Sequence, residues 1–157
     1  MRKLTAILIV VLVLLAGLTA WFWLGGTLHA HIYIQTARAS DYPDAYGAIR
    51  ALLDSGASPQ RFNHAALSED GSAYTLVDVN IALTNRGLFP AEWLDIRADA
   101  APGDIAVYAL TGEGGDVAAR DSATVNLKLI TTAPADAERD IHIQYYVHGM
   151  KRTVTVR

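Results

Sequence analysis

The chain has 157 residues, a formal net charge of −3 and no cysteine. The lack of cysteine excludes disulfide bonds, a thiol nucleophile, thiolate metal ligands and a lipid-modified N-terminal cysteine. The acidic residues are scattered along the chain, which argues against nucleic acid as a partner and gives no charged patch that would steer the chain to anionic lipid.

The longest apolar stretch runs from Leu4 to Leu24 and contains no charged residue. A helix of this length rises about 30 Å, which matches the hydrocarbon thickness of a bilayer. The stretch therefore predicts one transmembrane helix. Residues 1–26 would form an N-terminal membrane anchor, with the lipid bilayer as a partner.

Basic residues give this anchor a predicted orientation. Arg2 and Lys3 precede the apolar run, and the next basic residue is Arg38. Because positive charge stays on the cytoplasmic side, we expect a single-pass protein of the cell membrane, with the N-terminus cytoplasmic and the C-terminal domain outside. Trp21 and Trp23 fall at the outer end of the run, where amphipathic rings favour the headgroup level.

A cleaved signal peptide is the alternative interpretation, because a basic start and an apolar run also fit one. The run is longer than the usual signal core of about 7–15 residues. Cleavage after Ala20 or Ala30 would place a leucine where a small residue is preferred. We therefore expect the segment to be retained.

Residues 27–157 are predicted to form one extracytoplasmic β domain. Residues Leu28 to Gln35 alternate apolar and polar side chains, as a half-buried strand does. Six further segments separated by turn residues are also predicted to be strands, at residues 75–84, 92–98, 105–110, 122–131, 141–147 and 152–156.

Between the first two strands, the period changes to that of a helix at residues 43–54. Asp41 can cap this helix, Pro43 suits its first turn and Gly56 suits its end. Its apolar face includes Tyr46. In the main interpretation this face packs on the sheet edge, and in the alternatives it lies on the membrane or is offered to a partner.

About seven short strands and one inserted helix predict a mainly β fold, an antiparallel immunoglobulin-like β-sandwich preceded by one transmembrane helix. The Cys-Trp-Cys framework of antibody domains is missing. Residues 77–85, a strand that ends in Asn85, and the pattern Ile141-x-Ile143-x-Tyr145-x-x-x-Gly149 resemble the opening strand and the closing hairpin of immunoglobulin-like domains of the water-stress and late-embryogenesis type. The resemblance implies a binding or structural role and carries no active-site residues.

Two histidines on one strand face are the candidate metal ligands. His29 and His31 are spaced to suit zinc or copper, and His142, His148 and Met150 approach them if the first and last strands are neighbours. The alternative is that these positions are simply polar and face solvent. A pH sensor built on the pair is a variant of the metal hypothesis, and no cofactor is predicted.

Acidic residues in two loop regions give a second candidate metal site, for calcium: Asp95, Asp99, Asp104, Glu113 and Asp116. Their spacing does not match an EF-hand loop, and acidic residues are ordinary in turns. The sequence has no nucleophile elbow, phosphate loop or dinucleotide-binding fingerprint. The chain is therefore not predicted to be an enzyme.

Three aromatic residues are candidates for interaction with a partner: Tyr46, Phe89 and Trp93. Phe89 and Trp93 flank a bend and could form a contact patch, although in the preferred interpretation Trp93 plugs the end of the sandwich. The function we expect is a non-catalytic, membrane-anchored binding or assembly module, an accessory subunit for another membrane or envelope protein. The alternatives are a metal- or ligand-sensing outer domain and an envelope hydrolase.

Overall fold

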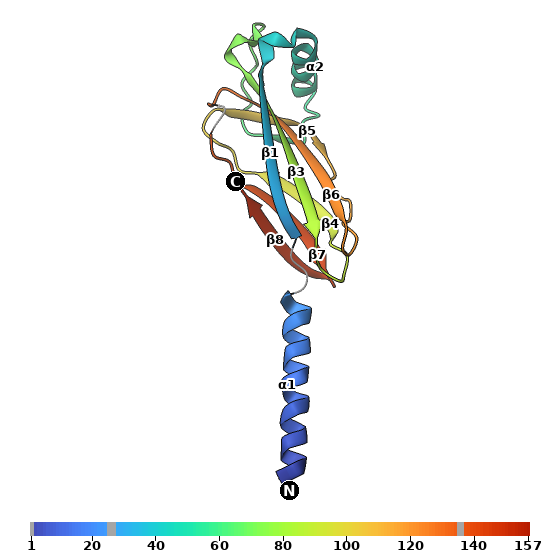
Figure 1. The fold of residues 1–157 in the computed structure, drawn as a ribbon. Coiled ribbons are helices and arrows are strands. Elements are labelled where there is room, and N and C mark those ends of the chain that lie inside the picture. Colours follow the sequence, from blue (N-terminus) through green and yellow to red (C-terminus); the bar gives the residue numbers. More distant parts are fainter. Residues whose placement is uncertain (1, 25–27, 135–136) are drawn as a thin grey trace.

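The structure, a computed structural model, describes residues 2–24, 28–134 and 137–157, and the side chains of residues 5–20, 28–134 and 137–157. Within this part the fold is mainly β, with two α-helices and eight strands in two antiparallel sheets. Figure 1 shows the sheets packed face to face and the first helix, α1 (Arg2–Leu24), standing apart from them.

The larger sheet has five strands in the order β1-β3-β6-β5-β2. These strands are β1 (Leu28–Arg38), β2 (Gln60–Arg61), β3 (Thr75–Asn85), β5 (Asp104–Thr111) and β6 (Ser122–Thr131). β1 and β3 pair along their whole length, from Leu28 opposite Asn85 to Arg38 opposite Thr75. β1 is therefore a long edge strand with a neighbour on one side.

The smaller sheet has three strands in the order β4-β7-β8. They are β4 (Glu92–Ala98), β7 (Ile141–Val147) and β8 (Met150–Val156). The turn between β7 and β8 contains His148 and Gly149, with φ values of 52° and 72°. Two successive positive φ angles match the twist of a tight hairpin, and the predicted hairpin at this place is confirmed.

The core lies between the sheets and follows the predicted period of two. Inward side chains of β3 and β7 are buried at alternate positions, at Val77, Val79, Ile81 and Leu83 and at Ile141, Ile143, Tyr145 and Val147. Side chains from both sheets belong to one apolar cluster. This packing confirms a β-sandwich.

A second apolar cluster lies on the outer face of the larger sheet, under the helix α2 (Pro43–Asp54). Tyr46, Ile49 and Leu53 of the helix are buried there with Ala106 and Ile130 of the sheet. The predicted bounds of this helix and its packing on the sheet are confirmed, but the helix covers the outer face of the sheet and not its edge.

The predicted number of strands and one predicted loop need correction. β2 lies inside residues 55–72, which the sequence pattern assigns to a loop, and it pairs Gln60 with Val107 and Arg61 with Ala106. A strand of two residues is too short to show an alternation. Short 3₁₀ helices at Ala39–Asp41 and Gly71–Ala73 were also missed.

The prediction of a transmembrane helix is wrong. Among the described residues, no helix is both long enough and apolar enough to cross a membrane. The helix α1 runs from Arg2 to Leu24, and its described side chains are those of residues 5–20. The remaining side chains on which the prediction relied lie outside the described ones, namely Leu4, Trp21, Trp23 and Leu24.

Candidate partner-binding groove

The two sheets separate along the side of the sandwich where β1 is the edge. At the start of β1 they are tied together, because the backbone N–H of Leu28 donates to the Tyr145 hydroxyl at 3.0 Å. Further along the strand, the core-facing side chain of Ile34 is 53% exposed. The sandwich is thus closed at one end of β1 and open at the other.

A groove of about 250 Å³ occupies this opening. Its floor is apolar and comes from both sheets, with Ile32 and Ile34 of β1, Val77 and Val79 of β3, and Ile141 of β7, and its rim has Ala137, Glu138, Arg139 and Arg157. Such a lining favours an apolar side chain of a ligand held near a polar rim.

The charges at the rim are already paired with one another. The Arg157 guanidinium donates to Asp140 at 2.7 Å and lies 3.7 Å from Glu138. The hydrogen bond from Arg157 lowers the pKa of Asp140, and the same bond raises the pKa of Arg157. These groups give the groove a charged border in which the opposite charges are paired.

Arg139, also at the rim, forms a buried ion pair. Its guanidinium makes two hydrogen bonds to Asp104, at 2.9 and 2.7 Å. Burial raises the pKa of Asp104, but hydrogen bonds from Arg139, Thr131 and the Ala101 N–H outweigh it, and the net pKa lies below its ordinary value. The pair fixes the loop that precedes β7 against the start of β5.

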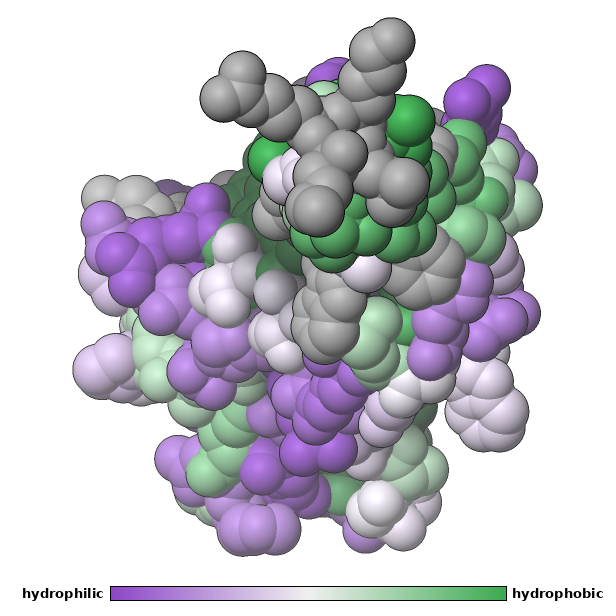
Figure 2. All heavy atoms as spheres, turned by 90° about the horizontal axis from the view of Figure 1, so that it is seen from below, coloured by the Kyte–Doolittle hydropathy of each residue, from purple (hydrophilic) through white to green (hydrophobic). Residues whose placement is uncertain are grey.

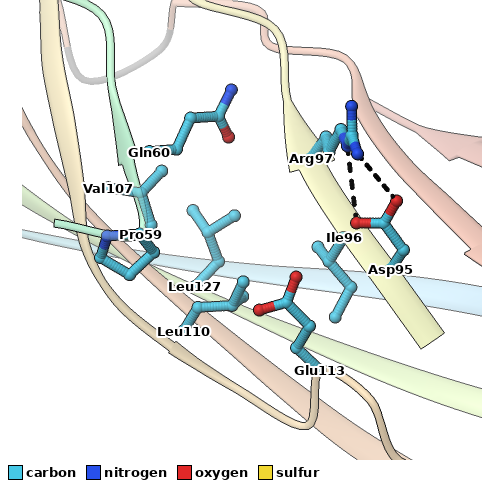
Figure 3. Close-up of a pocket in the computed structure, with 9 residues that line it drawn as sticks. All are labelled: Pro59, Gln60, Asp95, Ile96, Arg97, Val107, Leu110, Glu113 and Leu127. Atoms are coloured by element: carbon cyan, nitrogen blue, oxygen red, sulfur yellow. Dashed lines mark hydrogen bonds and ion pairs between the residues drawn. The ribbon is translucent and has the colours of Figure 1, made fainter. Parts of the chain in front are cut away.

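A second opening, of about 290 Å³, lies on the opposite side of the sandwich, between β4 and β5 (Figure 3). Val107, Leu110 and Leu127 form its floor. On its far wall the exposed Arg97 and Asp95 pair at 3.2 Å. The opening therefore also has an apolar floor and a charged rim.

The β4 edge beside this second opening is largely covered. The Gln60 side chain donates to the Ala98 carbonyl at 2.8 Å and accepts from the Ala98 N–H at 3.3 Å, as a neighbouring strand would. At the other end, the turn at residues 114–115 bonds both backbone groups of Leu94. Between these two covered ends of β4, Ile96 lines the opening.

The predicted histidine ligands lie on opposite outer faces of the sandwich. His29 and His31 are exposed on the outer face of β1. His142 points outward from β7 and is 2.9 Å from the Thr155 hydroxyl and 3.1 Å from Asp99. Within the described residues no three His, Cys, Asp or Glu side chains are grouped to hold a metal ion. A site at His29 and His31 alone stays a prediction.

His148 lies in the turn between β7 and β8, and its ring contacts Phe89 with 3.9 Å between centroids. The acidic candidates for calcium have different partners, since Asp104 pairs with Arg139, Asp99 with His142 and Asp116 with the Trp93 N–H.

The three aromatic candidates have different environments. Tyr46 is 4% exposed; its hydroxyl donates to the Ser68 carbonyl at 2.7 Å and its ring stacks on Tyr74, so it serves the core under α2. Phe89 is half-buried. Trp93 is 72% exposed at a bulge in β4, with φ 57°. Its expected role as an end plug is therefore wrong, whereas its role in interaction stays a prediction.

The groove beside β1 was missed by the sequence interpretation. Ile32 and Ile34 both belong to the apolar side of the first predicted strand, and this pattern assigns both to the core. The sequence does show that this is the first strand of the domain. Had it been placed at the edge of the sheet, a core-facing side chain such as Ile34 could have been expected to stay uncovered.

No protein-family model matches this chain, and no curated protein matches it. The resemblance to immunoglobulin-like domains of the water-stress and late-embryogenesis type accordingly stays a prediction from the quoted segments.

Proposed function

We propose that this protein is a non-catalytic binding module that holds a partner protein in the groove beside β1. The supporting observation is the groove itself, whose apolar floor includes the half-exposed Ile34 and whose rim charges are paired. Exposed apolar surface enclosed by a polar rim is typical of a protein contact.

We also propose that α1 places the module at a lipid surface. All described side chains of α1 are exposed, and they include ten large apolar residues between Ile7 and Leu18. In Figure 2, seen from the end of α1, the side chains of α1 are mainly hydrophobic, whereas hydrophilic residues cover much of the sandwich face behind it. Removing each large side chain from water is worth about 1.5–3 kcal/mol.

The polar groups of α1 fit this placement. The Thr19 hydroxyl donates to the carbonyl of Leu15 at 2.6 Å, within its own helix. A helix that bonds its polar groups internally can enter lipid without leaving a donor unsatisfied. The location of the sandwich outside the cytoplasm remains a prediction from Arg2 and Lys3.

Liposome flotation of the full chain tests the lipid proposal. The wild-type chain should float with phosphatidylcholine–phosphatidylglycerol vesicles. The double variant Val11→Lys, Leu15→Lys should lose at least tenfold in bound fraction, because it replaces two large apolar side chains whose removal from water is worth about 1.5–3 kcal/mol each. Val11→Leu, Leu15→Val is the volume-matched control. Equal flotation of both variants would contradict the proposal.

Site-directed photocrosslinking in intact membranes tests the partner. A photoreactive residue at Ile34, in the groove, should join the chain to one recurrent protein. The same residue at Thr124, exposed on the outer face of β6, is the control and should not. Equal crosslinking at both positions, or none at Ile34, would remove the support for a partner in the groove.

A further inference from the structure

The direction of the backbone groups along β1 can be assigned from three hydrogen bonds. In an antiparallel pair, alternate residues bond the neighbour and the others point away from it. The Ala39 N–H donates to the Tyr74 carbonyl, in the continuation of the β1–β3 register, while the Leu28 N–H turns away from β3 to Tyr145. Asn85 of β3, opposite Leu28, bonds Asp121 on the β6 side.

It follows that the even-numbered residues of β1 direct their N–H and C=O groups away from the sheet. Among them, Ile34 and Thr36 are exposed. Within the described part of the chain, no hydrogen bond reaches the backbone groups of either residue. A row of unsatisfied donors and acceptors with a two-residue repeat is the template for another strand.

The other strand edges are shorter, covered or charged. The β4 edge is bonded by Gln60 and by the turn at residues 114–115, and β2 has two residues. β8 carries Lys151 and Arg152, and charged residues on an edge discourage strand addition. The β1 segment at residues 32–38 has one charged residue, Arg38, at its end.

We propose that the exposed edge of β1 binds an extended segment of another protein, which pairs with the backbone of Ile34 and Thr36 and places an apolar side chain in the adjoining groove. This inference rests on the proposed function, because it specifies how the groove holds its partner. Backbone pairing would supply affinity, and the groove beside Ile34 would select the side chain at alternate positions.

The partner is a different chain rather than a second copy of this one. Two copies paired edge to edge through a two-fold axis would have antiparallel β1 strands. α1 leaves the sandwich at the end where β1 begins (Figure 1), so that pairing would send the two α1 helices in opposite directions. Both could not then enter the same lipid surface.

A matched pair of substitutions isolates the backbone contribution. Thr36→Pro removes an outward N–H that is not bonded to β3, and proline is tolerated at such edge positions. Thr36→Val keeps the N–H and the branched side chain. Ile34→Asp is a second variant, which keeps the N–H and places a charge at the groove.

The experiment selects heptapeptides with alternating apolar residues from a display library on the full chain in detergent micelles. Selected peptides should protect the amides of Ile34 and Thr36 from hydrogen exchange. They should bind Thr36→Pro and Ile34→Asp at least tenfold more weakly than wild type, and Thr36→Val with unchanged affinity. Circular dichroism checks that each variant is folded.

Three outcomes would overturn the inference: no enriched peptide, enriched peptides that bind all variants equally, or a chain that protects the same amides by forming dimers without peptide. Photocrosslinking at Ile34 separates this failure from failure of the proposed function. If one protein is crosslinked repeatedly but no strand pairing is found, the proposed binding module is supported and strand addition at β1 is rejected.

Discussion

Asp104 shows how the fold depends on a single ionised side chain. It is buried against Arg139 and accepts two hydrogen bonds from that guanidinium. Asp104→Asn should lower the free energy of unfolding by about 3–5 kcal/mol, because it leaves a buried charge without its counter-ion. Urea denaturation followed by circular dichroism measures this change.

The control for this substitution is Asp95→Asn, which breaks the exposed ion pair with Arg97. Exposed pairs contribute up to about 1 kcal/mol, so the control should change little. If both variants lowered the free energy of unfolding by similar amounts, the buried pair with Arg139 would stabilise the fold no more than an exposed pair does.

The pH dependence of stability should carry the signature of Asp104. Its pKa is lower in the folded chain than the ordinary value of about 3.9. Its stabilising contribution is therefore fully present above about pH 4 and is lost as the pH falls through the lower, folded pKa. Urea unfolding between pH 5 and 2 should show a steep loss in the wild type and a shallower one in Asp104→Asn. Parallel curves would contradict the assignment.

Trp93 illustrates strain at an exposed position. Its φ of 57° is in the left-handed region, which costs an L-residue about 1–2 kcal/mol. Trp93→Gly should leave the free energy of unfolding unchanged or raise it by up to about 1 kcal/mol, since glycine costs only about 0.5–1 kcal/mol of extra entropy. Trp93→Val is the control and should be destabilising. A larger loss with glycine than with valine would show that the exposed indole stabilises the fold.

Among the elements, α2 has the predicted bounds, and its apolar face packs on the sheet and is not offered to a partner. The helix covers the outer face of the larger sheet, with Leu53 buried beneath it. Leu53→Ala should cost about 2–5 kcal/mol through the cavity it leaves. Asp54→Ala, at the exposed neighbouring position, should change the free energy of unfolding by about 0.5 kcal/mol or less. Equal effects would argue that α2 does not pack on the sheet in solution.

The predicted boundaries of the helices and strands are correct where the repeat of apolar side chains is long enough to be recognised in the sequence. β3, β6 and β7 show a clear alternation of side chains, and α2 begins at Pro43 and ends at Asp54 as predicted. β2 could not be predicted, because its two residues pair with β5, some 45 positions away along the chain. The groove was missed for the same kind of reason, since its walls come from strands that are distant in sequence.

At the scale of the whole molecule, α1 and the sandwich should behave as energetically separate parts. The described α1 side chains are all exposed, and apart from its chain neighbours and the backbone of its own helix no described atom lies within 4 Å of a Cβ placed on Gly17. The variant Val11→Lys, Leu15→Lys should therefore keep the free energy of unfolding of the sandwich within about 0.5 kcal/mol of wild type. Near-ultraviolet circular dichroism during urea denaturation measures this. A larger change would show that α1 packs on the β domain.

The sequence alone determined the class of the fold and the position of most elements, because both depend on local period and on turn residues. It also identified the apolar N-terminal helix, although it overstated that helix as a transmembrane segment. The three-dimensional arrangement of the strands was needed to show that β1 is an uncovered edge, that Ile34 lines a groove, and that His29 and His31 lie on the face opposite to His142. These properties depend on which strands become neighbours, and that choice is fixed by packing between residues far apart along the chain.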